Sequence, residues 1–394
     1  MRLSTAVPGL PPGSYQELER LEWRPGDAGE PADLLADLLA EHGLDGPAGG
    51  GSTGGGPAGR GRGTVVALLL GANGCARLAG LPAGPASPVP AVPELVAVAL
   101  RAGDTTLYGP QPGGDTPYLP QPPRVGEWAS SWTDPEHAAA VETVRAAIAR
   151  GEVYQANVVG HRSAGHSSDP RDVAAAVAGL PGATYGGTLS GQGWAVGCAS
   201  PEQLVRVAGD RISTVPIKGT LRVAPGAQAA LRASSKDRAE HVMIVDLERN
   251  DLSRVAVTGS VEVEELYALT TWAGLWHASS TVAARLRPDV TVLDVLRALV
   301  PGGSVTGAPK RAACALLADL EPVGRGPAMG ALGVVTATGL ELGLTIRTVG
   351  VDHDRVHLWA GGGITWGSDA AAEVEEAHAK AGPVLRTLSA AASC

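Results

Sequence analysis

Two pairs of acidic residues repeat the same spacing in separate parts of the sequence. Asp237 and Glu240 are three residues apart, and so are Glu373 and Glu376. On a helix this spacing places both carboxylates of a pair on one face. Two such faces could hold a hard cation such as Mg²⁺, which combines one or two protein carboxylates with water and substrate oxygens. Solvated helix surfaces are the alternative, because Glu376 and Lys380 also have the spacing of an ordinary surface ion pair.

Lysine is scarce in this chain, and a scarce lysine is a candidate for chemistry. The sequence has 31 basic residues and no phenylalanine, and its only lysines are Lys218, Lys236, Lys310 and Lys380. Where arginine supplies most of the cationic charge, a lysine could do work that arginine cannot, because only an amine can lose its proton and become a nucleophile. Lys218 stands between Ile217 and Gly219, at the end of a predicted strand. A surface lysine at a strand end is the alternative.

Three further features could bind an anionic group. Residues 301–310 form a Gly-rich loop containing Ser304, and the free N–H groups of the helix that follows could receive a carboxylate or phosphate. The loop is not a P-loop, because it lacks the GKS or GKT triplet. The triplet Gly361-Gly362-Gly363 allows close approach of a backbone to a ligand, or forms a strand-to-helix turn. Arg347 lies among apolar residues of a predicted strand, as an anion anchor or in a structural ion pair.

Periodicity and helix-capping signals predict the elements that position these residues. Helices are expected at 32–42, 134–150, 237–247, 291–300, 309–320 and 369–388, with Asp134 and Thr291 as N-caps. Strands are expected at 64–70, 153–159, 203–207, 211–215, 341–351 and 356–360. Strands and helices mix without a strict βαβ alternation, which favours an α+β fold over a doubly wound sheet.

The chain changes character near residue 125. Residues 49–63 are a Gly-rich stretch typical of a flexible linker, and residues 81–96 and 109–123 are rich in proline. Residues 1–125 are therefore expected to form a divergent Gly/Pro-rich N-terminal region. Regular structure is expected to dominate residues 126–394.

Composition excludes some classes of function. The formal net charge of −9 repels a phosphate backbone and argues against nucleic acid as a partner. The longest apolar run, at 65–70, is too short to span a membrane, and residues 1–13 lack the apolar stretch of a signal peptide. A cytoplasmic protein with no membrane partner is expected. A reducing compartment also fits the isolated positions of Cys75, Cys198, Cys314 and Cys394.

Taken in order, several segments resemble the chorismate-utilising enzymes from about residue 130 to the C-terminus. They are residues 151–157 (GEVYQAN), 200–202 (SPE), 216–220 (PIKGT), 236–251 (KDRAEHVMIVDLERND), 301–310, 345–348 (TIRT), 360–364 and 373–380. The resemblance implies an α+β fold of the anthranilate synthase component I type, in which two packed β-sheets are flanked by helices. It makes 126–394 a chorismate-binding catalytic domain, and it implies Mg²⁺ as cofactor.

Within the family, the sequence is most similar to the aminodeoxychorismate synthase branch, which supplies para-aminobenzoate for folate or secondary metabolism. In that branch, the lysine that Lys218 matches adds to ring carbon 2 as the carbon 4 hydroxyl leaves, and ammonia then attacks carbon 4. Glu202 matches the general acid that protonates the departing hydroxyl. Gln155 stands where isochorismate and salicylate synthases carry a lysine that activates water. Its identity favours ammonia as the incoming nucleophile.

The resemblance also assigns the remaining site residues. Asp237, Glu240, Glu373 and Glu376 match the four acidic positions around magnesium. Arg347 matches the arginine that binds the enolpyruvyl carboxylate. The other substrate-pocket positions are matched by His277, Ser304, Gly361, Gly362, Gly363 and Lys380.

Some positions depart from the family pattern. Asp237 stands where many relatives have glutamate, and Ala328 stands where relatives usually have an aromatic residue in the substrate pocket. The sequence has no GxCxG nucleophile elbow, so ammonia is expected from a separate glutamine amidotransferase subunit or from solution. An anthranilate or 2-amino-2-deoxyisochorismate synthase is one alternative, against which Lys218 argues. A catalytically inactive scaffold that binds a glutaminase is another.

Overall fold

The computed structural model describes residues 7–10, 15–46, 63–102, 121–272 and 275–390. Most of the predicted linker at 49–63 and of the Pro-rich stretch at 109–123 lies outside the described residues. Only the backbone is described at Thr220, Arg222, Ser235, Lys236, Asp237, Trp272, Leu275 and Ala390. No helix within the described ranges is long and apolar enough to cross a membrane.

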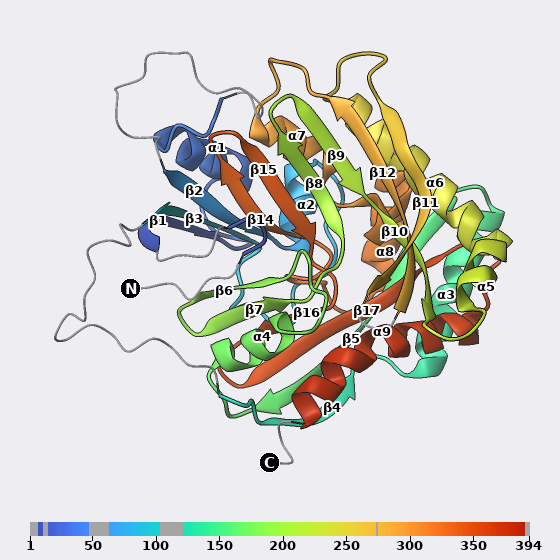
Figure 1. Ribbon diagram of the computed structural model, residues 1–394. Helices are drawn as coiled ribbons and strands as arrows, with labels where there is room; N and C mark the ends of the chain where they lie inside the picture. Colours follow the sequence, from blue (N-terminus) through green and yellow to red (C-terminus); the bar gives the residue numbers. More distant parts are fainter. Residues whose placement is uncertain (1–6, 11–14, 47–62, 103–120, 273–274, 391–394) are drawn as a thin grey trace.

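Two antiparallel β-sheets form the body of the molecule (Figure 1). The ten-stranded sheet has the order β1 (Tyr15–Trp23), β3 (Leu95–Ala102), β2 (Thr64–Leu70), β14 (Ala331–Thr336), β15 (Gly339–Leu344), β8 (Gln203–Ala208), β9 (Arg211–Val215), β12 (Leu275–Arg285) and β10 (Ile217–Arg222), and β11 (Glu262–Trp272) also pairs with β12. The seven-stranded sheet has the order β13 (Gly307–Ala308), β5 (Gln155–His166), β17 (Arg355–Ile364), β16 (Thr348–Val351), β7 (Trp194–Cys198) and β6 (Gly187–Gly191), with β4 (Val125–Ser130) also on β5. The predicted α+β class with two sheets and flanking helices is confirmed.

Some of the helices begin at a residue whose side chain caps them. They are α1 (Pro31–Glu41), α2 (Ala72–Leu78), α3 (Asp134–Ala149), α4 (Pro170–Ala178), α5 (Ala227–Ala233), α6 (Ser235–Ser253), α7 (Val292–Leu299), α8 (Lys310–Leu320) and α9 (Ala370–Ala390), with one 3₁₀ turn, η1 (Gly303–Val305). Thr291 caps α7 as predicted, in a capping box with Asp294. The N-cap of α3 is Thr133 instead of Asp134, because Thr133 accepts a hydrogen bond from the Glu136 N–H and Glu136 bonds back.

The predicted strand at 341–351 is wrong as a single element. The chain leaves the larger sheet after β15 and enters the smaller sheet at β16, and Arg347 lies in the connection between them. Arg347 has a φ of 52°, in the left-handed region where a residue with a side chain is strained. The Gly361-Gly362-Gly363 triplet lies inside β17 and pairs with residues 157–159 of β5, so it is not a strand-to-helix turn.

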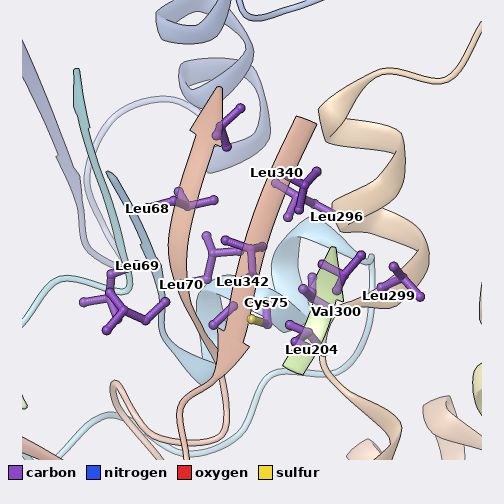
Figure 2. Close-up of a cluster of buried hydrophobic side chains, with 14 of the residues drawn as sticks. Leu68, Leu69, Leu70, Cys75, Leu204, Leu296, Leu299, Val300, Leu340 and Leu342 are labelled. Carbon is purple, nitrogen blue, oxygen red and sulfur yellow. The ribbon is translucent and has the colours of Figure 1, made fainter. Parts of the chain in front are cut away.

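The N-terminal strands belong to the larger sheet. β2 pairs with β14 from Val65 opposite Thr336 to Leu70 opposite Ala331. Figure 2 shows leucines of β2 in one apolar cluster with residues of β8, β15, α2 and α7, among them Leu204, Leu342, Cys75 and Leu296. The described part of 1–125 therefore shares a sheet and a core with later strands. A division of the chain near residue 125 stays a prediction.

Two buried histidines join the strands β5 and β17. His161 Nε2 lies 3.1 Å from His357 Nδ1, and the two rings stack with their centroids 5.3 Å apart. Ser131 Oγ is hydrogen bonded to the other ring nitrogen of His161. Burial lowers the pKa of His161 to about 3 and the pKa of His357 to about 4. Both rings are therefore uncharged at neutral pH.

We expect the free energy of unfolding to decrease as the pH falls from the ordinary histidine pKa of 6.5 toward about 4. In this window the unfolded chain protonates both rings while the native chain keeps them neutral, so the unfolded state binds more protons. The loss should be on the order of 3 kcal/mol for each ring. Urea unfolding at a series of pH values measures it. His357→Gln removes one titrating ring and should flatten the dependence, whereas an equally steep dependence would contradict this assignment.

Candidate active site

Residues from both sheets and from α6 and α9 line a cavity of about 150 Å³. It brings together predicted residues that are widely separated in the sequence: Glu202, Lys218, Glu240, His277, Ser304, Arg347, Gly361, Gly363, Glu373, Glu376 and Lys380. The predicted residues therefore converge on one cavity, which is lined by both cationic and anionic side chains.

Lys218 and His277 enter the cavity from two paired strands. On β10, Lys218 lies opposite Ala278 of β12, and Thr220 lies opposite His277, so Gly219 is an extra residue in the ladder. Gly219 has a φ of 72°, which a residue with a side chain rarely adopts. The bulge therefore lets Lys218 and His277 both line the same cavity.

Ser304 contacts the two residues predicted to be catalytic. Its hydroxyl donates a hydrogen bond to Glu202 Oε1 at 2.7 Å, and its carbonyl accepts one from Lys218 Nζ at 3.2 Å. Arg325 holds the same turn in place, because its guanidinium donates to the carbonyl oxygens of Val305 and Asn157. One 3₁₀ turn thus fixes an amine and a carboxyl group relative to each other.

Burial moves the pKa values of these two groups toward each other. Burial raises the pKa of Glu202, against the hydrogen bond from Ser304 and the charge of Lys218. Burial lowers the pKa of Lys218, and Lys380 adds to this effect, while Glu240 and Glu202 oppose it. Loss of water disfavours the charged form of each group. The site therefore favours a protonated carboxyl beside an amine that gives up its proton more easily than usual.

Arg347 and His277 form a second polar side of the cavity. Burial lowers the pKa of Arg347 to about 10, with Glu202 opposing the shift, so the guanidinium stays charged at neutral pH. Burial, together with the charges of Arg347 and Lys380, lowers the pKa of His277 to about 4, so the imidazole is neutral. A fixed guanidinium next to a neutral ring suits the binding of a carboxylate.

Three carboxylates line the side of the cavity formed by α6 and α9. A Cβ added at Gly362 would lie 3.0 Å from Glu373 Oε2 and 3.9 Å from Glu376 Oε1. Both oxygens therefore approach the backbone of β17 at a glycine, where no side chain intervenes. Glu240 enters from α6, where its Oε1 lies 3.5 Å from Thr365 Oγ1. Lys380 Nζ contacts Glu376 Oε1 at 2.7 Å and the carbonyl oxygen of Gly361 at 2.9 Å.

These carboxylates fit a hard cation that keeps water ligands. The donor atoms are all oxygens, which suits Mg²⁺. Within the described residues, the oxygens of Glu240, Glu373 and Glu376 do not all lie within 4.8 Å of one another. Direct binding by one or two of them, with water between the ion and the rest, is therefore the arrangement that fits. The side chain of Asp237, the fourth predicted ligand, lies outside the described residues.

Gln155 and Lys218 both approach Gly363 of β17. A Cβ added at Gly363 would lie 3.1 Å from Lys218 Nζ and 3.2 Å from Gln155 Nε2. The Gln155 amide is fully buried, and neither of its polar atoms has a hydrogen-bond partner within the described part of the chain. A buried amide without partners is costly, so this group is available for a polar ligand.

Some residues of the cavity wall were not predicted from the sequence. Asn157 and Trp359 line it. Both could have been predicted, because residues two apart on a strand face the same side, and they lie two residues from Gln155 and Gly361, respectively. Met329 also lines it, with a φ of 58°, whereas its neighbour Ala328 is fully buried and is not part of the wall. Ala328 therefore does not form part of the cavity wall as expected, and its neighbour Met329 does.

Comparison with known proteins agrees with this geometry. A sequence profile of the chorismate binding enzymes matches residues 99–386. Aminodeoxychorismate synthase component 1 of Salmonella typhimurium is 36% identical over 268 residues, which cover 66% of this chain and 59% of that protein. Anthranilate synthase component 1 of Haloferax volcanii is 37% identical over 303 residues, which cover 74% of this chain and 55% of that protein. The chain thus spans less than two thirds of either relative.

Solved structures share the fold. The crystal structure of anthranilate synthase component I from Streptococcus pneumoniae aligns with a TM-score of 0.76 at 23% identity, covering 97% of this chain and 94% of that one. A 2,3-dihydroxybenzoate-specific isochorismate synthase from Bacillus anthracis aligns with a TM-score of 0.68 at 18% identity, covering 95% and 94%. The two-sheet fold is thus shared with these structures. Because the family profile covers most of the sequence and the predicted residues meet in one cavity, we conclude that the chain belongs to the chorismate-binding enzymes.

Proposed function

We propose that this chain is an aminodeoxychorismate synthase component I, which converts chorismate and ammonia into 4-amino-4-deoxychorismate. The observation that carries the proposal is the pairing of Lys218 and Glu202 through Ser304. A buried amine with a lowered pKa beside a carboxyl with a raised pKa is what a nucleophile and a general acid require. Anthranilate synthases of similar identity make amination at carbon 2 the second candidate.

In the first step, the neutral amine of Lys218 attacks carbon 2 of the ring. The two ring double bonds shift toward carbon 4, and the bond between carbon 4 and its hydroxyl breaks. Glu202 donates its proton to the leaving hydroxyl, which departs as water, and Ser304 steadies the carboxylate that results. An adduct at carbon 2 blocks that position, and this favours carbon 4 over carbon 2 as the place where nitrogen is added.

In the second step, ammonia attacks carbon 4 and the double bonds shift back. The bond between carbon 2 and Lys218 breaks, and the proton released by the new ammonium group can return to Glu202. The unpartnered amide of Gln155 near Lys218 is a neutral polar group that could orient ammonia. Glutamine cannot act as a base toward water, which supports ammonia as the second reactant.

Arg347 supports binding of a substrate carboxylate, since its guanidinium lines the cavity and stays charged. Glu240, Glu373 and Glu376 are the residues that would hold Mg²⁺, with Asp237 as the fourth acid of the set. When bound, Mg²⁺ would neutralise a carboxylate of the substrate and stabilise negative charge. We infer that a glutamine amidotransferase subunit supplies ammonia, because aminodeoxychorismate synthase relatives are named as component 1.

Lys218→Arg should reduce turnover of chorismate with ammonium roughly 10³-fold or more, although it keeps the positive charge. The guanidinium stays protonated and cannot attack the ring. Lys218→Ala should also be slow and should release some product aminated at carbon 2, because that carbon is no longer blocked. Chromatography of the products measures both effects. A Lys218→Arg variant with the wild-type rate and an unchanged thermal unfolding temperature would exclude the covalent mechanism.

Removal of divalent metal with EDTA should abolish turnover, and added Mg²⁺ should restore it. Glu240→Gln removes one negative charge from the proposed site and should raise the Mg²⁺ concentration needed for half-maximal rate by about tenfold or more. Glu375→Gln is the matched control, because Glu375 is exposed on α9 and does not line the cavity. Full activity in metal-free buffer, or equal effects of the two substitutions, would contradict the metal assignment.

The purified chain should use ammonium but not glutamine as its nitrogen source. Glutamine should become a substrate when a glutamine amidotransferase subunit is added, and inactivation of that subunit's nucleophile should leave the ammonium reaction unchanged. Product formation from each nitrogen source, with and without the subunit, is the measurement. Glutamine-dependent turnover by the chain alone would overturn this part of the proposal.

A further inference from the structure

A second buried carboxyl group lies behind the turn that carries Ser304. Glu248 is on α6, about two turns after Glu240, and only 4% of it is exposed. A Cβ added at Gly303 would lie 3.0 Å from Glu248 Oε1 and 2.5 Å from Leu247 Cδ2. The helix thus packs closely against η1, and a side chain at this position would have to displace the ends of Leu247 and Glu248. Glu202 contacts η1 through Ser304, so two carboxyl groups lie close to one turn.

Two acids and one lysine act on Glu248 through their charges, and Arg254 also acts on Asp251. On its own helix, Asp251 binds Lys310 of α8 through a contact of 2.8 Å, and both side chains are almost fully buried. On β9, Thr214 is hydrogen bonded to Glu248, and the carboxyl of Glu202 also acts on Glu248. The ammonium group of Lys310 is thus bonded to Asp251. Within the described residues, no lysine or arginine forms an ion pair with Glu248.

Burial raises the pKa of Glu248 to about 8, and Asp251 and Glu202 add to the rise while Lys310 opposes it. An ionised Glu248 would add a negative charge to a dry region in which Lys310 is already bonded to Asp251. The group therefore carries its proton at neutral pH. Its burial and its lack of an ion pair within the described residues agree with this conclusion.

We propose that Glu248 is a positioning residue for Glu202, acting as an uncharged acid that supports η1. In the proposed function, on which this inference rests, Glu202 becomes a carboxylate each time it protonates the leaving hydroxyl. Two carboxylates that lie near the same turn in a buried site repel each other. A neutral Glu248 permits the charge on Glu202, and it keeps η1 and Ser304 in position. An ionised Glu248 would make Glu202 a poorer acid and would force η1 away from α6.

Glu248→Gln tests the proposal, because glutamine has the same shape and cannot ionise. At about pH 7 its kcat should be within about twofold of the wild type. As the pH rises through about 8, Glu248 ionises in the wild type, so the wild-type kcat at saturating free ammonia should decrease. The kcat of Glu248→Gln should not show this decrease. Asp246→Asn is the matched control, an exposed acid on the same helix, and its pH profile should follow the wild type. An identical alkaline decrease in Glu248→Gln and the wild type would overturn the proposal, as would a kcat about tenfold lower at pH 7.

A second measurement does not depend on turnover. Infrared difference spectra recorded across the alkaline range should show that a protonated carboxyl band disappears in the wild type and is absent from Glu248→Gln. Equal spectra for the two proteins would reject a protonated Glu248. If the wild type shows the band but does not aminate chorismate, the proposed function is rejected instead, and with it the role of Glu248.

Discussion

The double hydrogen bonding of Ser304 is the interaction on which the site depends. Its hydroxyl binds Glu202 and its carbonyl binds Lys218, so one short turn sets the separation of the proposed acid and nucleophile. The turn is held in place, because Arg325 links Val305 to Asn157 on β5 and pairs with Glu321, the C-cap of α8. Behind it, α6 packs against Gly303. The two sheets and three helices therefore serve to hold a few polar atoms at fixed distances.

Burial explains why these residue types become reactive there. The same loss of water raises the pKa of Glu202 and lowers the pKa of Lys218, so each group moves toward its uncharged form. Arg347 keeps its charge despite burial, since even its lowered pKa of about 10 is well above neutral pH. One environment thus suits three residues to the roles proposed for them: a proton donor, a nucleophile and an anion-binding cation. The acidic side formed by α6 and α9 supplies the opposite charge at the other edge of the cavity.

The sequence predicted which residues meet in the cavity better than it predicted the path of the chain between them. Lys218 stood out because an amine is rare in an Arg-rich chain, and motif order led to Glu202 and Arg347. The chain path at Arg347 was not predicted, because a left-handed residue that joins two sheets leaves no mark in hydrophobic periodicity. Strand β1 was also missed, because its alternation is weak and most of its residues are half-buried. Long-range packing decides such features, and it also decides that Glu248 faces η1 instead of solvent.

The central claim is that Lys218 occupies ring carbon 2 while nitrogen is added at carbon 4. The most direct test is to identify the product of the wild-type chain with chorismate, Mg²⁺ and ammonium, after treatment with a lyase that removes pyruvate. The account predicts para-aminobenzoate, because the adduct with Lys218 leaves only carbon 4 open to ammonia. Fluorescent anthranilate as the main product would contradict it, since nitrogen would then have entered at the carbon that Lys218 is proposed to block.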